Sequence, residues 1–293
     1  MKADIQWSNR FTLITLLCSV YFGLILGYKP VIIVHGVMTG NETMLPMAQR
    51  IQELHPGTKV FVTDRFGGWS SLRPMWHQVM EIGSDILQFM AFHPSGVHLI
   101  GYSQGGLLSR AILEYYPDHN VNTFISLSAP QCGQYGTKFL HIFFPTLACE
   151  TAYELFYSSI GQHTSVGNYW NDPYHQKLFF EYSAFLPYVN NLVLSENSKL
   201  FKKGFTKIKK LVLIGGPDDS VITPWQSSQF GCFDSNGSVI EMRDQLFYKN
   251  DSFGLLTMDS QKKIDIVTLS GLDHSDWHTN MSVLDNYIIP YLD

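Results

Sequence analysis

The sequence is poor in charge, in cysteine and in basic tracts, and each scarcity argues against a class of protein. Only 15% of its 293 residues are charged, and the net charge is −5 with neutral histidines. The densest basic stretch is a short group of lysines at residues 202–210. Nucleic-acid binding is therefore not expected, because it needs a concentrated positive patch. The 4 cysteines include no C-x-x-C spacing, which argues against a metal site built from thiolates.

Long apolar runs are also scarce, and the one that exists lies at the N-terminus. Residues 11–27 are almost wholly apolar and follow Lys2 and Arg10. A basic start, a short apolar stretch and a small-residue end are typical of a secretory signal peptide. We predict a signal peptide at residues 1–27, with an uncleaved anchor as the alternative. No other stretch has the length and apolarity of a membrane span, so the processed protein is expected to be luminal, with no transmembrane anchor.

The sequons and the cysteines can both be interpreted for a protein in the lumen of the secretory pathway. In an oxidising lumen Cys132 and Cys149 could close a loop, which would leave Cys232 free. Several sequons behind a signal peptide favour a glycoprotein of the secretory route. The candidate N-glycosylation sites are Asn41, Asn236, Asn250 and Asn280.

Strand-like and helix-like segments alternate over residues 28–293, which we predict to be one domain. Apolar runs predict strands at residues 31–34, 59–63, 97–100, 123–127, 210–214 and 265–269. Helical spacing covers residues 72–92 and 276–291. This order predicts an α/β fold: a mainly parallel sheet with helices on both faces and ligands at the carboxyl ends of the strands.

One segment interrupts the alternation. Residues 132–205 contain no clear strand pattern and are rich in Phe, Tyr and Trp. We predict an inserted helical cap over the carboxyl ends of the strands. Most of its aromatic side chains are expected to pack the cap onto the domain, and a minority to line an apolar tunnel.

The pentapeptide Gly101–Gly105 carries the clearest chemical signal, because it reads G-x-S-x-G between a strand and a helix. A tight strand-turn-helix with serine at its apex is the nucleophile elbow of an α/β-hydrolase. The turn leaves room only for glycine on either side, and it presents the Ser103 hydroxyl above the sheet edge. We therefore predict that Ser103 is a catalytic nucleophile.

The acid and the base of such a site follow the serine in the chain. After the strand at 210–214, either Asp218 or Asp219 could orient the base. After the strand at 265–269, His274 is preferred over His278 because a loop can aim it at Ser103.

An oxyanion hole needs two main-chain N–H groups. We predict that they come from Gln104 and Val37, with His35 in a structural role that holds the Val37 loop.

With these residues placed, the chain resembles the palmitoyl-protein thioesterases, closest to their lysosomal type. The resemblance runs from about Tyr28 to the C-terminus, and its most specific block is residues 217–225, Pro-Asp-Asp-Ser-Val-Ile-Thr-Pro-Trp. It implies a lysosomal serine hydrolase that cleaves fatty acyl thioesters of acyl-CoA or S-acylated proteins without a metal or cofactor, with secretion as the alternative location. It also implies that Asp219 is the acid and His274 the base.

Two other functions stay open on the sequence. A luminal lipase or carboxylesterase would use the same residues on oxygen esters. A catalytically inactive hydrolase fold could serve as a luminal binding module, although Ser103, Asp219 and His274 occur in the order that an active enzyme requires.

Overall fold

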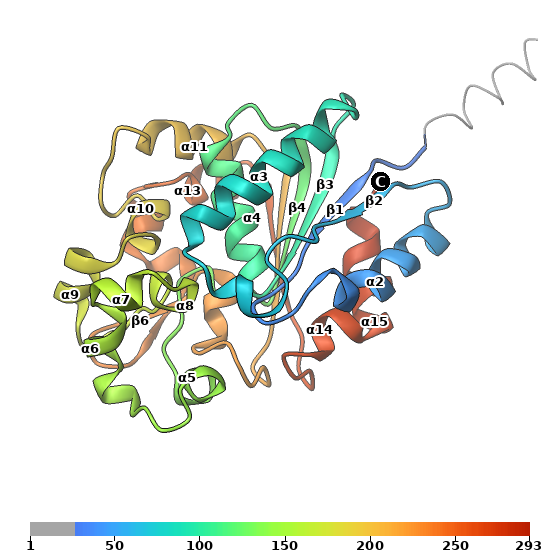
Figure 1. Cartoon of the computed structure of the whole chain (residues 1–293). Coiled ribbons are helices and arrows are strands. Elements are labelled where there is room, and N and C mark those ends of the chain that lie inside the picture. Colours follow the sequence, from blue (N-terminus) through green and yellow to red (C-terminus); the bar gives the residue numbers. More distant parts are fainter. Residues whose placement is uncertain (1–26) are drawn as a thin grey trace, which may run out of the picture.

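A sheet of six parallel strands runs through the centre of the structure (Figure 1). The computed structural model describes residues 27–293, so the predicted signal peptide lies, apart from Gly27, outside the described residues. Across the sheet the order is β2-β1-β3-β4-β5-β8. The prediction of a mainly parallel sheet is confirmed. Its strands are β1 (Val31–Val34), β2 (Val60–Val62), β3 (Val97–Tyr102), β4 (Val121–Leu127), β5 (Lys210–Gly215) and β8 (Ile264–Thr268).

The apolar runs in the sequence reflect burial of the sheet on both faces. In β5, Leu211 and Leu213 belong to one buried cluster, whereas Val212 and Ile214 belong to the other. Side chains alternate between the faces of a strand, so a strand covered on both sides must be apolar at every position.

Helices cover both faces (Figure 1). One face packs against α3 (Met75–Ala91), α4 (Gln104–Tyr115) and α11 (Ser198–Thr206). The other packs against α2 (Asn41–Leu54), α14 (Asp276–Thr279) and α15 (Met281–Val283). Within residues 27–293, no helix has the length and apolarity that a bilayer crossing requires.

The segment between β4 and β5 is helical, and we call residues 132–205 the cap segment. Its aromatic side chains are mostly buried, among them Phe156, Trp170 and Phe185. The helices between β4 and α11 are α5 (Thr137–Phe143), α6 (Ala152–Phe156), α7 (Ser159–Gln162), α8 (Ser165–Asn168), α9 (Gln176–Tyr182) and α10 (Leu186–Val189). Between β5 and β8 lie a hairpin of β6 (Cys232–Phe233) and β7 (Val239–Ile240), then α12 (Leu246–Lys249) and α13 (Leu255–Ser260).

Two predicted helices differ from those observed. The helix expected from residue 72 begins at Met75, after Pro74 in extended backbone. The helix expected over 276–291 is divided, because Asn280 adopts an extended conformation and its side chain accepts the Ser282 N–H to begin α15. Helical turns then cover Leu284–Ile288 and Ile289–Tyr291.

The predicted cysteine pairing is wrong. Cys132 is bonded to Cys232, and Cys149 is a buried free thiol. The 128–137 loop is tied to the chain after β5, since the Ser227 hydroxyl accepts the Cys132 N–H at 3.0 Å and donates to the Gly133 carbonyl at 2.6 Å. This packing brings two cysteines 100 residues apart to a Cα–Cα distance of 5.7 Å.

A buried ionisable pair lies where α4 meets the cap segment. Arg110 and Glu114 are both fully buried, 3.8 Å apart. The Arg110 guanidinium donates to the Asn190 side chain and lies 5.2 Å from the Phe230 ring centre and 5.1 Å from that of Phe253. Among the described residues neither Glu114 oxygen has a hydrogen-bond donor. The two terminal nitrogens of Arg110 are hydrogen-bonded, whereas its Nε and both Glu114 oxygens have no partner among the described residues.

Stability is expected to fall as pH rises through the titration range of Glu114. Burial raises the pKa of Glu114 from 4.5 to about 8, although nearby Arg110 lowers it. Between these values the folded protein holds a proton that the unfolded chain has released, so stabilisation present below 4.5 is lost towards pH 8. Glu114→Gln should flatten this slope of unfolding free energy with pH, measured by urea unfolding at several pH values. The exposed Glu154→Gln is the matched control, and an unchanged slope in Glu114→Gln would contradict the assignment.

Candidate active site

Ser103 occupies a strained turn between β3 and α4. Its φ is +54°, in the left-handed region that non-glycine residues rarely adopt. A Cβ on Gly101 would lie 2.5 Å from the Gly106 Cα, and one on Gly105 would lie 2.3 Å from the Val34 carbonyl oxygen. Side chains are thus excluded on both sides of the serine, as the elbow geometry requires.

The strand order brings distant loops to this turn. In the sheet order, β2 lies on one side of β1 and β3 lies on the other. The loops after β1 and β3 therefore lead to opposite faces of the sheet and leave a crevice at the carboxyl ends of these strands. Ser103 follows β3, and Gly36 lies in the loop after β1, where an added Cβ would lie 3.1 Å from the Ser103 Cβ. The loops after β5 and β8 end at the same edge and carry Asp219 and His274.

The structure brings Ser103, His274 and Asp219 together in one hydrogen-bonded chain. The His274 Nε2 lies 2.9 Å from the Ser103 Oγ. On the other side of the ring, Nδ1 lies 2.8 Å from one Asp219 oxygen and 3.1 Å from the other. Ser103 and Asp219 are buried, while His274 is partly accessible. In this arrangement Nδ1 donates to the carboxylate and Nε2 accepts the serine proton.

Asp219 is held ionised by the groups around it. Burial by itself raises the pKa of the Asp219 carboxyl, but hydrogen bonds from His274, Ser128 and Ile222 outweigh burial and leave the pKa below its usual value of 3.8. Its two oxygens accept from the His274 ring, the Ser128 hydroxyl, the Trp277 indole N–H at 2.8 Å, and the main-chain N–H groups of Val221 at 2.8 Å and Ile222 at 2.9 Å.

Val37 and Gln104, the two N–H donors predicted for an oxyanion hole, directly follow Gly36 and Ser103 in the chain. Within residues 27–293, neither main-chain N–H has a hydrogen-bond acceptor. His35 braces the Val37 loop, since its Nε2 lies 2.9 Å from the Arg65 carbonyl oxygen. The Gln104 side chain is fixed by donation to the Ser71 carbonyl at 2.9 Å and by acceptance from the Tyr169 hydroxyl at 3.1 Å.

The structure places the competing Asp and His elsewhere. Asp218 accepts the Gly271 N–H at 2.7 Å and so links the loops after β5 and β8. His278 packs against Tyr102, with ring centres 4.4 Å apart, and burial lowers the pKa of its imidazole below its usual value. The bridging role of Asp218 is structural, and its carboxylate is not the one at the His274 ring.

The sequence did not indicate the residues that support the hydrogen-bonded chain of Ser103, His274 and Asp219. Ser128 and Trp277 both donate to the Asp219 carboxylate. The Tyr102 hydroxyl donates to the His274 carbonyl at 2.9 Å, and Tyr169 reaches Gln104 from the cap segment. The only available sequence signal was position: Ser128 directly follows β4, and Trp277 lies one helical turn beyond His274.

Together, the parallel sheet and the strained serine turn define an α/β-hydrolase fold. A mature lipase of Bacillus licheniformis has the same fold, with a TM-score of 0.51 over 92% of this chain and 94% of the lipase, at 13% identity. The family model described as palmitoyl protein thioesterase matches residues 30–274.

Two curated relatives are more similar in sequence to this chain than that lipase is. The lysosomal thioesterase PPT2 homolog of Drosophila melanogaster is 50% identical over 96% of this chain and 98% of its own length. Lysosomal thioesterase PPT2 of Homo sapiens is 47% identical over 90% of this chain and 88% of its own length. The chain therefore belongs to the palmitoyl protein thioesterase family, and both the predicted family and the predicted fold are confirmed.

Proposed function

We propose that this protein is a serine hydrolase that cleaves fatty acyl thioesters through an acyl-enzyme, with Ser103 as nucleophile, His274 as base and Asp219 as acid. The observation that carries the proposal is the hydrogen-bonded chain from Ser103 Oγ through both His274 nitrogens to Asp219, at 2.9 and 2.8 Å. The names of the relatives, lysosomal thioesterases, support the choice of a thioester substrate.

The first half of the reaction forms the acyl-enzyme. His274 Nε2 takes the hydroxyl proton as Ser103 Oγ attacks the thioester carbonyl carbon, and Asp219 stabilises the resulting imidazolium. The carbonyl oxygen gains negative charge, which the N–H groups of Val37 and Gln104 are positioned to bind. Collapse of this intermediate breaks the carbon–sulfur bond and releases the thiol, which takes the proton from His274.

Water completes the cycle. His274 removes a proton from water, and the water oxygen attacks the acyl carbon bound to Ser103. His274 then gives the proton to Ser103 Oγ as the carbon–oxygen bond breaks, which releases the fatty acid and restores the serine hydroxyl. The chemistry is supplied by side chains and main-chain N–H groups alone, so no metal or cofactor is assigned. The lowered pKa of Asp219 keeps its carboxylate ionised at the mild acidity of a lysosome.

We assign the surrounding features on the same basis. The cap segment is proposed to cover the acyl chain, since Tyr169 reaches from it to Gln104. A lysosomal location follows from the names of the relatives. Among the sequons, Asn236, Asn250 and Asn280 are exposed, whereas Asn41 is half-buried at the start of α2; the exposed three are the better candidates for glycan attachment.

A matched pair of substrates tests the substrate class. Palmitoyl-CoA and an oxygen-ester analogue of the same chain length should be hydrolysed with kcat/KM values that favour the thioester by about tenfold or more, which is about 1.4 kcal/mol in transition-state free energy. Turnover is followed by thiol release for one and fatty acid release for both. A preference for the oxygen ester would identify a lipase or carboxylesterase instead, and absence of turnover on both would favour a binding module.

A further inference from the structure

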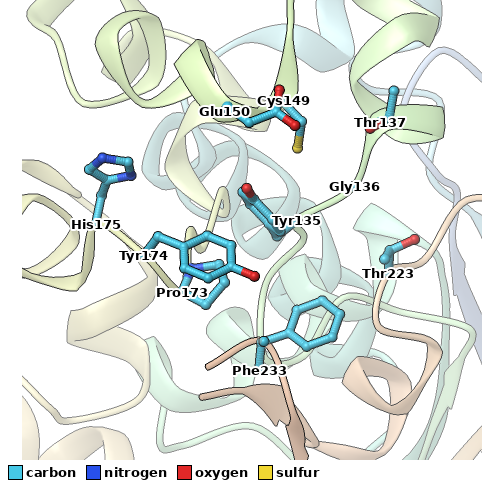
Figure 2. A pocket seen from close by; sticks show the side chains of 11 residues that line it. Tyr135, Gly136, Thr137, Cys149, Glu150, Pro173, Tyr174, His175, Thr223 and Phe233 are labelled. Carbon is cyan, nitrogen blue, oxygen red and sulfur yellow. The ribbon is translucent and has the colours of Figure 1, made fainter. Parts of the chain in front are cut away.

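A cavity of about 680 Å³ opens in the cap segment, and none of Ser103, Asp219 and His274 lines it. Its walls come from three separate parts of the chain: the cap segment, the loop that follows Asp219, and the β6–β7 hairpin (Figure 2). This volume is in the range of small-molecule sites. The cavity is therefore large enough for a ligand and is distinct from the Ser103 site.

Aromatic rings form one side of the cavity. The rings of Tyr135 and Tyr174 have centres 5.9 Å apart and planes at 71°, and those of Tyr135 and Phe233 are 6.4 Å apart at 87°. The Cys132–Cys232 disulfide braces this wall, since Cys232 directly precedes Phe233 and Cys132 is three residues before Tyr135. Roughly perpendicular rings, held in place, present the negatively charged faces that attract cations.

The other side of the cavity is polar and carries a negative charge. Figure 2 shows Glu150 across Tyr135 from Tyr174 and Phe233. Glu150 is exposed at the cavity wall, and no Lys or Arg side chain lines the cavity. Its one imidazole, His175, is already bonded to Asp172 at 2.8 Å. The lining therefore attracts a positive charge, and it contains no lysine or arginine that would neutralise Glu150.

The hydroxyl groups narrow the class of cation. Thr137 and Thr223 also line the cavity. Burial raises the pKa of the Tyr135 hydroxyl, so this group stays neutral. These oxygens accept hydrogen bonds, which a primary ammonium or guanidinium group can donate and a quaternary ammonium group cannot.

We propose that this cavity binds a ligand with a primary ammonium or guanidinium group on an alkyl chain, such as a lysine or arginine side chain. The cation lies against the rings of Tyr135, Tyr174 and Phe233 and pairs with Glu150. Two sources offer this chemistry: a basic residue in the peptide that carries the acyl thioester, or a free amine.

The cavity is close enough to the triad for a peptide carrier. Thr223 follows Asp219 by four residues, so their Cα atoms are at most about 14 Å apart. Its carbonyl accepts the Tyr135 N–H at 2.9 Å, which fixes the cavity wall to the Asp219 loop. An extended peptide of a few residues covers this distance.

Binding is tested in the Ser103→Ala protein, where turnover does not interfere and the result does not depend on the proposed function. The probes are the Nα-acetyl amides of lysine, arginine and norleucine, titrated by NMR or calorimetry. The lysine or arginine probe should bind about tenfold more tightly than norleucine, which has the same chain without the charge. Glu150→Gln should weaken binding of the lysine and arginine probes by about threefold to fivefold, and Phe233→Leu should also weaken it.

Glu154→Gln is the matched control, because Glu154 is also exposed on the cap segment but does not line the cavity. It should leave binding unchanged. Equal binding of the three probes, or lysine binding that survives both Glu150→Gln and Phe233→Leu, overturns the proposal.

Two further measurements distinguish the sources. S-palmitoyl cysteinyl peptides with lysine or norleucine near the cysteine are compared by kcat/KM, and 1,5-diaminopentane is titrated as a free amine. Faster hydrolysis of the lysine peptide, lost in Glu150→Gln, identifies the carrier as the source. Diamine binding without a difference between the peptides identifies a free cation. Failure of the proposed function shows instead as no hydrolysis of any substrate, with probe binding intact.

Discussion

Ser103→Ala is expected to lower kcat for palmitoyl-CoA by about five orders of magnitude while the protein stays folded. The substitution removes the hydroxyl oxygen that lies 2.9 Å from His274 Nε2, so the proposed base has no serine nucleophile to activate. A fluorophosphonate probe should label the wild-type protein at Ser103 and leave the variant unlabelled. Peptide mass spectrometry locates the adduct, and steady-state thiol release measures the rate.

Ser109→Ala is the matched control for this experiment. Ser109 lies on α4 and is fully buried. Among the described residues its hydroxyl has no hydrogen-bond partner. Its removal should change kcat by less than about threefold, because no reacting group is touched. Retention of more than about 1% of wild-type activity in Ser103→Ala would show that another residue is the nucleophile.

The four central strands, β1, β3, β4 and β5, were predictable because they are buried on both faces. A run such as Val31–Val34 is apolar at every position, and β1 covers the same residues that the run predicted. The serine turn was equally predictable. A side chain at Gly101 would collide with Gly106, a few residues along the chain, and one at Gly105 would collide with the main chain at the end of β1. Local constraints of this kind leave a readable pattern.

Features that depend on long-range packing left no such pattern. Asp219 receives hydrogen bonds from Ser128 after β4 and Trp277 in α14, and neither spacing indicates that they meet. The Cys132–Cys232 pair depends on how the chain after β5 folds back onto the 128–137 loop. Asp218 and Asp219 are adjacent and both acidic, so the residues alone did not decide which of them contacts the His274 ring. Long-range packing decides it.

That choice leads to the second large effect: Asp219→Asn is expected to reduce kcat by about four orders of magnitude. One carboxylate oxygen accepts the N–H groups of Val221 and Ile222, so the amide oxygen of asparagine must take that position. The amide NH2 then faces His274 Nδ1. To avoid two opposed donors, the ring carries its proton on Nε2, where it can no longer accept the proton of Ser103.

The same geometry predicts a separable cost in stability. The Trp277 indole N–H would also face the new NH2 group, leaving a buried donor without an acceptor, which costs about 1–3 kcal/mol. Trp277→Phe combined with Asp219→Asn should recover part of this stability, measured by urea unfolding, without recovering kcat. The rate loss would then be attributed to the histidine tautomer and not to partial unfolding.

Asp218→Asn supplies the control, because its side-chain oxygen can still accept the Gly271 N–H. This variant should retain kcat within about threefold, as expected for a substitution that keeps its hydrogen bond and lies outside the reacting groups. Comparable losses in Asp218→Asn and Asp219→Asn would show that both act through the shape of the loop. A fully active Asp219→Asn would mean that His274 does not need a carboxylate to hold its working tautomer, and the proposed division of roles would be wrong.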